Sequence, residues 1–388
     1  MMWLLRGLLW LCVLITLFVV SFKARFGGSL QTFPDHRTPP ILSTAEADQR
    51  LQVVASLPAA PGNVAVSASG RIFFTFHPEG RPQGTKVAEL VGGQPVAFPS
   101  PQLQSKGAAG QPFFDTPLGL RIDGNDHLWI IDHGFHGLRQ PRLLAFDLKT
   151  GALVHRYDIP SAVAGVGSFL QDLAVARDGS VVYIADANIM GGRPALVVYD
   201  VARGLAQRRL ERHESVTDQP YLVRAKGKPL RLLGGLFNVH VAVDSIALDR
   251  RGEWLYFGPM AKDSLYRVRA DDLRNFSLGD ADLGRRIERF ADKVQTDGIS
   301  TDSDGNVYLT DIEHGGLARI SANGTLQTLF HSSRIRWADG LSFGPDGYLY
   351  IADSNLAELM MQSRGHMQTQ APYFIFRIQL GVSAPAGQ

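Results

Sequence analysis

Cysteine is nearly absent from this chain of 388 residues, and its single copy, Cys12, lies in an apolar N-terminal segment. The rest of the chain therefore has no disulfide, no cysteine nucleophile and no thiolate metal site. A charge excess is also missing, because 39 Lys and Arg nearly balance 37 Asp and Glu, and no long basic run occurs. Proteins that bind nucleic acid usually carry a basic stripe, so no nucleic-acid partner is expected.

Several motifs of catalysis and cofactor binding are missing as well. No Gly-rich loop has the spacing of a P-loop or a dinucleotide fingerprint, so no nucleotide cofactor is expected. No G-x-S-x-G elbow occurs, and a serine triad is not indicated. Glycine and proline are frequent, with 40 and 21 copies, which is typical of many short strands joined by turns.

The N-terminus carries the longest apolar run, residues 7–22, with basic residues on both sides. No small-x-small cleavage site follows it, so residues 1–26 are interpreted as an uncleaved membrane anchor, with a cleaved signal peptide as the alternative. Both interpretations predict an exported protein, either secreted or periplasmic and membrane-anchored, that meets the membrane only through this segment. Residues 27–48 are interpreted as a proline-rich linker.

One hairpin pattern recurs along the rest of the chain. Each copy has an alternating apolar strand, a polar turn that contains glycine, and a second strand rich in aromatic and β-branched residues. The copies are Gly62–Phe76, Leu118–Asp132, Gln171–Asp186, Asp244–Gly258, Asp297–Asp311 and Asp339–Asp353. One match would be weak evidence, but six copies with a shared frame indicate a repeat architecture.

A third strand pattern follows each hairpin, and usually a more polar fourth one. Four strands in each of six units predict an all-β, six-bladed β-propeller over residues 49–382, with a short tail at 383–388. The last unit lacks its fourth strand, whereas an orphan strand at Arg50–Leu57 precedes the first hairpin. We expect this N-terminal strand to complete the last blade and close the ring, which removes two open sheet edges.

Polar residues occupy one column at the starts of these hairpins. Because the first strand of each blade lines the central channel of a propeller, the strand starts ring one mouth of that channel. The residues predicted to meet there are Asn63, Asp172, Asp244, Asp297 and Asp339. Carboxylates brought together repel one another unless they bind a cation, share a proton or accept hydrogen bonds. The column therefore predicts a site for calcium or another divalent cation, or for a cationic organic ligand.

Aspartates in such a repeat also have a structural interpretation, as caps of their own turns. We favour this role for the acids at the hairpin ends, Asp132, Asp186, Asp311 and Asp353, and for the Asp-Gly turns at 178–179, 304–305 and 346–347. Because the two ends of a hairpin are cross-strand neighbours, Asp297 is expected opposite Asp311, and Asp339 opposite Asp353.

Histidines and aromatic residues flank the same mouth. His133 and His240 are candidates for lining the pocket or for a general base, since imidazole titrates near neutrality. His77 and His314 stand at comparable positions, and the sequence does not choose among them.

Phe76 and Trp337 can stack on a ligand ring or hold an amine by a cation–π contact, although core packing between blades is the commoner role. The long polar segment Arg212–His240 is interpreted as a surface excursion, with a lid over the channel as the alternative.

With these residues in place, the chain resembles the major royal jelly protein/yellow family, in a bacterial-type version. The stretches that carry the resemblance are Pro61–Pro78, Pro117–Gly134, Leu170–Ala187 and Trp337–Leu356. The resemblance implies a six-bladed propeller, mostly secreted, and some insect members of the family bind biogenic amines in the channel.

A wider resemblance is to the senescence-marker-protein/gluconolactonase propellers, which are calcium- or zinc-dependent lactone hydrolases. Asp297-Gly298 and Asp339-Gly340 look like their Asp-Gly site motif, whereas Asn63 stands where they carry a glutamate. The sequence therefore leaves open a protein that binds a small cationic or aromatic molecule, a metal-dependent lactonase-like hydrolase or isomerase that uses the same site, and a scaffold with an empty channel.

Overall fold

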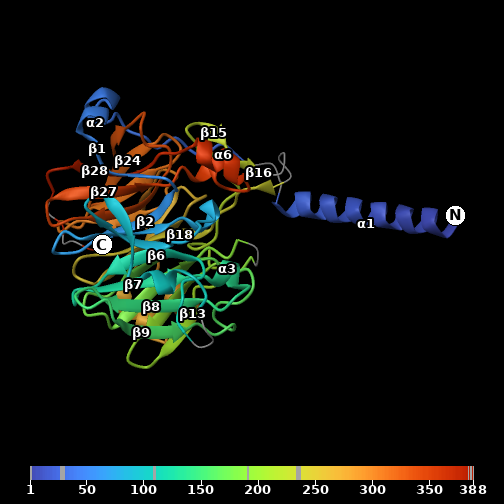
Figure 1. Ribbon diagram of the computed structural model, residues 1–388, viewed down its shortest axis with the longest axis horizontal. Coiled ribbons are helices and arrows are strands. Elements are labelled where there is room, and N and C mark those ends of the chain that lie inside the picture. Colours follow the sequence, from blue (N-terminus) through green and yellow to red (C-terminus); the bar gives the residue numbers. More distant parts are fainter. Residues whose placement is uncertain are drawn as a thin grey trace.

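The computed structural model describes residues 2–26, 31–107, 111–189, 192–232, 237–382, 384 and 387. Within these residues, antiparallel four-stranded sheets form the blades of a six-bladed β-propeller (Figure 1). The predicted fold class is confirmed.

The first three blades follow one another along the chain. Blade one consists of β2 (Pro61–Val66), β3 (Ile72–Phe76), β4 (Val87–Val91) and β5 (Gln94–Ala97). Blade two consists of β6 (Pro117–Ile122), β7 (His127–Asp132), β8 (Arg142–Asp147) and β9 (Leu153–Asp158). Blade three consists of β10 (Leu170–Val175), β11 (Val181–Asp186), β12 (Ala195–Asp200) and β13 (Leu205–Arg209).

The remaining blades complete the ring. Blade four consists of β18 (Val243–Leu248), β19 (Trp254–Pro259), β20 (Ser264–Arg269) and β21 (Glu288–Asp292). Blade five consists of β22 (Ile299–Thr301), β23 (Val307–Asp311), β24 (Gly316–Ile320) and β25 (Leu326–His331). Blade six consists of β26 (Ala338–Phe343), β27 (Tyr348–Asp353), β28 (Tyr373–Gln379) and the N-terminal β1 (Gln52–Leu57), which pairs antiparallel with β28. The predicted closure of the ring by the N-terminal strand is confirmed.

Burial follows the position of a strand in its blade. The innermost strands, such as β6 and β10, are buried along their whole length, whereas the outer strand β9 is mostly exposed or half-buried. The apolar core fills the spaces between blades. Between blades one and two, the ring of Phe146 packs against Phe98 and Phe114 at centroid distances of 6.1 and 5.8 Å. Burial of one such ring contributes about 1.5–3 kcal/mol.

Glycines at the strand starts let neighbouring inner strands approach closely. A Cβ atom on Gly340 would collide with the side chain and backbone of Asn63, and one on Gly298 would collide with the backbone of Asp339. The Asp-Gly pairs therefore serve packing around the axis as well as placing the acids.

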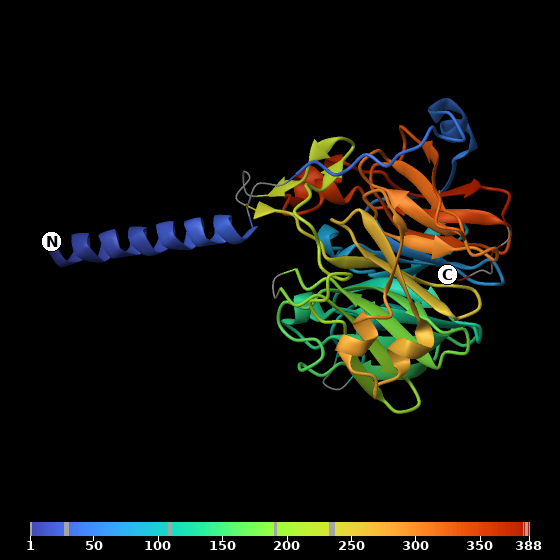
Figure 2. The same ribbon diagram turned by 180° about the vertical axis from the view of Figure 1, so that it is seen from behind.

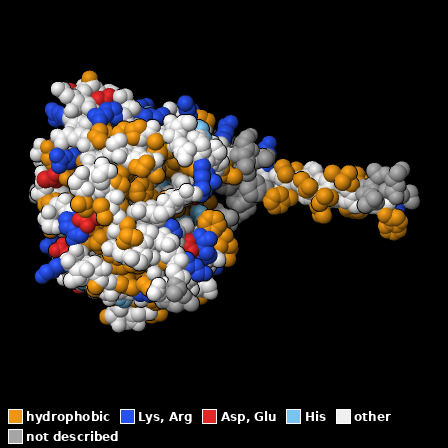
Figure 3. Space-filling model, viewed as in Figure 1, with side chains coloured by type: hydrophobic (Ala, Val, Ile, Leu, Met, Phe, Trp, Pro, Cys, Tyr) orange, Lys and Arg blue, Asp and Glu red, His pale blue; other side chains and the backbone are white. Residues whose placement is uncertain are grey.

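The N-terminal helix α1 (Met2–Phe26) projects from the propeller (Figures 1 and 2). Its large apolar side chains, among them Leu9 and Trp10, are exposed along its length (Figure 3). No helix in the described part of the chain combines the length and the apolar character that crossing a membrane requires.

The described part of the predicted linker lies against the propeller. Phe33 is buried, with its ring edge-on to Tyr221 at 5.2 Å, and the amide of Thr38 donates to the side chain of Thr328. Helix α2 (Thr44–Arg50) follows, and a capping box between Ser43 and Glu46 starts it.

A long insertion separates blades three and four. It contains β14 (Arg224–Ala225), β15 (Lys228–Pro229), β16 (Arg231–Leu232) and β17 (Phe237–Asn238). In both ribbon views it lies beside α6 (Arg364–Thr369), on the side of the propeller from which α1 projects (Figures 1 and 2).

Buried apolar side chains of this insertion, such as Val223 and Val239, share one cluster with Phe76, Phe169 and Trp337 from three different blades. The insertion therefore packs on the face of the propeller where the inner strands start, which favours the alternative interpretation as a lid over the channel.

The other short helices lie in connections. They are η1 (Pro78–Gly80), η2 (Pro101–Gln104), α3 (Gly134–Gly137), α4 (Ala270–Arg274), α5 (Asp280–Gly284) and η4 (Leu356–Glu358).

Candidate functional site

The predicted site residues lie where the inner strands break register. Shifts in pairing occur between Pro61 and Val64, Pro117 and Leu120, Leu170 and Leu173, Val243 and Ser245, and Ala338 and Leu341. Such β-bulges leave residues unpaired and bend the strand, which re-aims their side chains. Asn63, Asp172, Asp244 and Asp339 all fall within these bulges.

The bulge in blade six also overturns the expected pairing of Asp339 with Asp353. Asp353 lies opposite Ala338, not Asp339. In blade five the paired strand begins only at Ile299, and the amide of Asp297 donates to Oγ1 of Thr310. The predicted pairing of Asp339 with Asp353 was wrong because it assumed an unbroken register along the two strands, whereas the pairing of Asp297 with Asp311 stays a prediction.

One half of the ring is a closed hydrogen-bonded group built on Arg121 of β6. Its guanidinium donates from Nη1 to Oδ1 of Asn63 at 3.0 Å and from Nη2 to Oδ2 of Asp172 at 2.9 Å. Nδ2 of Asn63 also donates to Oδ1 of Asp172 at 3.1 Å. Burial raises the pKa of Asp172, and the charge of Arg121 opposes that shift. Asn63 and Asp172 are therefore hydrogen-bonded to Arg121 and to each other, and their role as metal ligands stays a prediction.

The other half holds Asp244, Asp297 and Asp339. The indole Nε1 of Trp337 donates to Oδ2 of Asp297 at 2.7 Å, and Nε2 of Gln171 approaches Oδ1 of Asp297 at 3.5 Å. Burial raises the pKa of Asp297 to about 7. Burial and then the charge of Asp297 raise the pKa of Asp244 and Asp339 well above the usual range.

Three oxygen atoms in this half have no hydrogen-bond partner within the described residues. They are Oδ2 of Asp244, Oδ2 of Asp339 and Oε1 of Gln171, and all three atoms are buried. A buried polar group without a partner is costly, and a buried carboxylate more so. Carboxylate and amide oxygens are the donors that calcium prefers, so the chemistry of these donors suits a hard divalent cation. Among the described residues, the group whose ligand atoms already lie within 4.8 Å of one another is Asp311, His314 and His331, and not these acids.

The charge of Lys293 acts on Asp244, but this lysine neutralises the acid poorly. Its side chain is fully buried, and burial lowers its pKa to about 7 although Asp244 favours its charged form. Its Nζ donates to the carbonyl of Val294 at 3.2 Å. Lys293 therefore does not compensate the negative charge that the buried carboxylates carry when they ionise.

A neutral imidazole stands beside Asp339. Nε2 of His77 lies 3.5 Å from Oδ2 of Asp339, and burial lowers the pKa of His77 to about 4. Nδ1 of His77 accepts the amide hydrogen of Glu79, so the hydrogen of the neutral ring resides on Nε2.

His133 lies close to His77, and its pKa is lowered well below normal by burial and by the charges of His136 and His77. Its ring packs edge-on against Phe169 at 5.0 Å.

Two predicted residues stand apart from the acids. His240 pairs with Asp218 through Nδ1 at 3.0 Å, in the lid. Phe76 packs edge-on against Phe74 at 5.1 Å in the apolar cluster. Trp337 does reach the acids, but as a fully buried hydrogen-bond donor and not as an exposed stacking surface.

The residues that sequence reasoning did not select are Arg121, Gln171, Lys293 and His77. Arg121 could have been identified from the sequence, because it is the one charged residue inside the apolar strand Leu118–Ile122. His77 was among several equivalent histidines, and only the fold places it beside Asp339.

Three of the four acids at the hairpin ends are structural, as predicted. Each accepts a backbone N–H from the chain that leads into its own blade: Thr116 to Asp132 at 2.8 Å, Phe169 to Asp186 at 2.8 Å and Trp337 to Asp353 at 2.7 Å.

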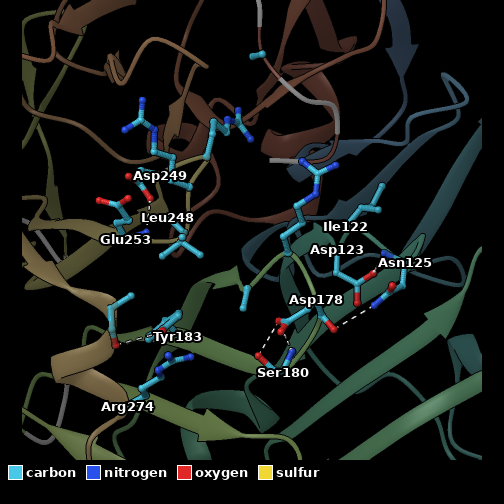
Figure 4. Close-up of a pocket in the computed structure, with 18 of the residues that line it drawn as sticks. Ile122, Asp123, Asn125, Asp178, Ser180, Tyr183, Leu248, Asp249, Glu253 and Arg274 are labelled. Atoms are coloured by element: carbon cyan, nitrogen blue, oxygen red, sulfur yellow. Dashed lines mark hydrogen bonds between the residues drawn. The ribbon is translucent and has the colours of Figure 1, made fainter.

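The opposite end of the channel opens into a cavity of about 1040 Å³ at the hairpin turns. Asp123, Asp178, Tyr183 and Asp249 line it (Figure 4). Oδ1 of Asp178 accepts the amide and the hydroxyl of Ser180, which confirms this acid as turn chemistry. None of the predicted ring acids lines this cavity, so its size does not bear on the acid cluster.

The fold and the buried acids define a six-bladed β-propeller with a polar site on its axis. The sequence matches the family described as major royal jelly protein over residues 116–365, more than half of the chain. The chain therefore belongs to the major royal jelly protein family.

Honeybee proteins show the relationship. Major royal jelly protein 3 of Apis mellifera is 26% identical over 219 residues, which cover 54% of this chain and 38% of that protein. Major royal jelly protein 6 of the same species is 30% identical over 160 residues, which cover 38% of this chain and 34% of that protein. The match thus spans well under half the length of these curated relatives.

Solved structures share the fold at low identity. A gluconolactonase from Xanthomonas campestris has a TM-score of 0.54 at 13% identity, with 91% of this chain and 98% of that one covered. Regucalcin from Agrobacterium tumefaciens, described as a calcium-binding protein, has a TM-score of 0.55 at 15% identity, with 90% and 100% covered. These similarities show the propeller architecture.

Proposed function

We propose that this protein is a small-molecule-binding propeller whose buried acid cluster holds a divalent cation, calcium in the first instance. Asp244, Asp297 and Asp339 supply carboxylate oxygens, and Gln171 supplies an amide oxygen. The observation that carries the proposal is the set of unpartnered buried oxygens on Asp244, Asp339 and Gln171.

The ligand is proposed to be a small cationic or aromatic molecule that binds under the lid. The ion, when bound, provides positive charge for a polar group of the ligand. The apolar cluster of Phe76, Phe169 and the lid residues offers burial for its ring or chain. The calcium-binding description of the regucalcin neighbour supports the choice of ion.

A second function, a lactonase-like hydrolase, is favoured by His77. Its imidazole is neutral at pH 7 and lies beside Asp339, and because its Nδ1 already accepts the amide of Glu79, its Nε2–H can donate a hydrogen bond to an oxygen of the substrate while a carboxylate of the acid cluster takes the proton from an attacking water. The gluconolactonase neighbour supports this alternative by its description alone.

Calcium binding to the full-length chain tests the proposal. We expect one calcium ion to bind by isothermal titration and to raise the unfolding temperature, and we expect Asp244→Asn and Asp339→Asn to abolish both effects. Asp178→Asn, at the turn end of blade three, is the matched control and should bind calcium normally. Equal binding by all variants would refute the assignment.

Ligand experiments then separate the two functions. Binding of an amine or an aromatic compound without turnover supports the binding protein. Hydrolysis of a lactone that depends on calcium and is lost in His77→Gln supports the enzyme. An amine that competes with calcium would show that the amine itself fills the acid cluster.

We further propose that the protein is exported, with residues 1–26 as its export signal. The exposed apolar side chains of α1 support this role. N-terminal sequencing of the mature protein and fractionation of the cells that make it test the proposal, and recovery of the intact chain from cytosol alone would refute it.

A further inference from the structure

A group of metal-ligating side chains lies outside the acid cluster, on blade five. Asp311 ends β23, His314 follows in the turn before β24, and His331 ends β25. Nδ1 of His314 lies 2.9 Å from Oδ1 and 3.0 Å from Oδ2 of Asp311, and Nε2 of His331 lies 3.2 Å from Oδ2 of Asp311. One ligand atom from each of the three residues fits within 4.8 Å of the others.

The other blades provide an internal comparison for this position. Asp132, Asp186 and Asp353 are the equivalent hairpin-end acids, and each has an arginine as its cationic neighbour. The nitrogen–oxygen distances are 4.0 Å for Arg142 to Asp132, 2.6 Å for Arg208 to Asp186 and 3.1 Å for Arg336 to Asp353.

In blade five the side chains that contact the carboxylate of Asp311 are instead two imidazoles, and its backbone donor is the amide of His314, which follows it in the chain. Asp311, which occupies a capping position of the repeat, is thus surrounded by the types of side chain that ligate a metal ion.

The chemistry of these donors matches a first-row transition ion. Two imidazole nitrogens and one carboxylate oxygen are common ligands of Zn²⁺, at about 2.0–2.2 Å from the ion. Four atoms at that distance in a tetrahedron lie roughly 3.3–3.6 Å apart. The observed separations from Asp311 are only slightly shorter, so small movements of the two rings admit an ion.

The site has a charged carboxylate and an open side. Burial pushes the pKa of Asp311 upward, but the hydrogen bonds from His314 and His331 outweigh it and hold the pKa below its usual value. The carboxylate is fully buried, whereas the side chains of His314 and His331 are 25% and 22% exposed. Water can therefore reach the ion and fill a remaining position.

The cationic side chains near Asp311 are hydrogen-bonded to other groups. Arg37 acts on Asp311, but Asp35 engages its guanidinium through two hydrogen bonds of 2.8 and 2.7 Å. Nζ of Lys226 donates to the carbonyl of Ser332 at 2.7 Å, and burial lowers the pKa of this lysine.

We propose that Asp311, His314 and His331 form a second cation site, selective for a zinc-like transition ion and distinct from the oxygen-lined axial site. The ring nitrogens that donate to Asp311 become the ligands, so each imidazole moves its hydrogen to the other nitrogen or releases it on binding. The ion would join the β23–β24 turn to the outer strand β25.

Metal titration of the full-length, metal-stripped protein tests this proposal. We expect Co²⁺ to bind with one equivalent that shows the visible absorption of imidazole-ligated cobalt, and Zn²⁺ to displace it. His314→Ala and His331→Ala should each weaken Zn²⁺ binding by about tenfold or more, since even outer-sphere partners of a metal ligand contribute on that scale.

Two control variants show whether Zn²⁺ binds at this site and not elsewhere. His366→Ala removes an imidazole that also pairs with an acid, Glu358, at 2.7 Å, and it should leave Zn²⁺ binding unchanged. Asp244→Asn should lose calcium and keep Zn²⁺, which separates this site from the proposed function. No Zn²⁺ binding by the wild-type protein, or equal binding by the His314 and His331 variants with normal circular dichroism, would overturn the proposal.

Discussion

Replacement of Asp297 by asparagine should change how the stability of the metal-free protein depends on pH. The acid is buried, and burial raises its pKa from 3.8 to about 7. The folded state therefore keeps Asp297 protonated at pH values where the unfolded chain has already ionised it. The stabilisation is complete below pH 4 and is lost as the pH rises toward 7.

The size of the effect follows from the two pKa values. A shift from 3.8 to about 7 corresponds to about 4 kcal/mol once the pH exceeds both values, at about 1.4 kcal/mol for each unit. Between pH 5 and pH 7.5, the part contributed by Asp297 falls by roughly 2–3 kcal/mol. Asparagine has no ionisable group, and its amide can still accept the N–H of Trp337 and contact Gln171. The unfolding free energy of the variant should therefore not fall by this amount between pH 5 and pH 7.5.

The assay is urea unfolding of the full-length wild-type and Asp297→Asn proteins at pH 5 and at pH 7.5, with a chelator present. The difference in unfolding free energy between the two proteins should shift by roughly 2–3 kcal/mol in favour of the variant at the higher pH. Calcium should raise the unfolding free energy of the wild-type protein at pH 7.5, and it should raise that of the variant less or not at all. A difference that is the same at both pH values would refute the buried, protonated acid.

Further substitutions test other parts of the site. Arg121→Met leaves its two buried partners without their cation and should cost about 3–5 kcal/mol in urea unfolding, and a loss below 1 kcal/mol would contradict the closed group. Gly340→Ala places a Cβ against Asn63 and should cost about 1–3 kcal/mol, visible as a lower melting temperature, whereas an unchanged melting temperature would mean that the strands are farther apart than observed. Trp337→Phe removes the hydrogen-bond donor to Asp297 and should lower the free energy of unfolding by about 1–3 kcal/mol. Calcium binding, measured by calorimetry, should also weaken. Unchanged calcium affinity in this variant would show that the indole does not hold the carboxylate of Asp297 in place for the ion.

Much of the architecture could be predicted from the sequence, because a propeller repeats one short pattern. The hairpins from Gly62 to Asp353 revealed the blades, and the missing fourth strand of the last unit predicted the role of Arg50–Leu57. Such periodicity is local, so it survives without knowledge of long-range contacts. The sequence favoured a surface excursion for the insertion because its short strands have no period of their own, and only the buried cluster that it shares with the blades favours a lid.

What the sequence by itself determined was the repeat, the closure of the ring and the column of acids at the strand starts. The tertiary structure decided which acids have partners. Bulges redirected the side chains, Arg121 occupied Asn63 and Asp172, and Asp244 and Asp339 were left with unpartnered buried oxygens. The physical reason is that burial and charge pairing depend on residues up to hundreds of positions apart, whereas a strand pattern records only its nearest neighbours.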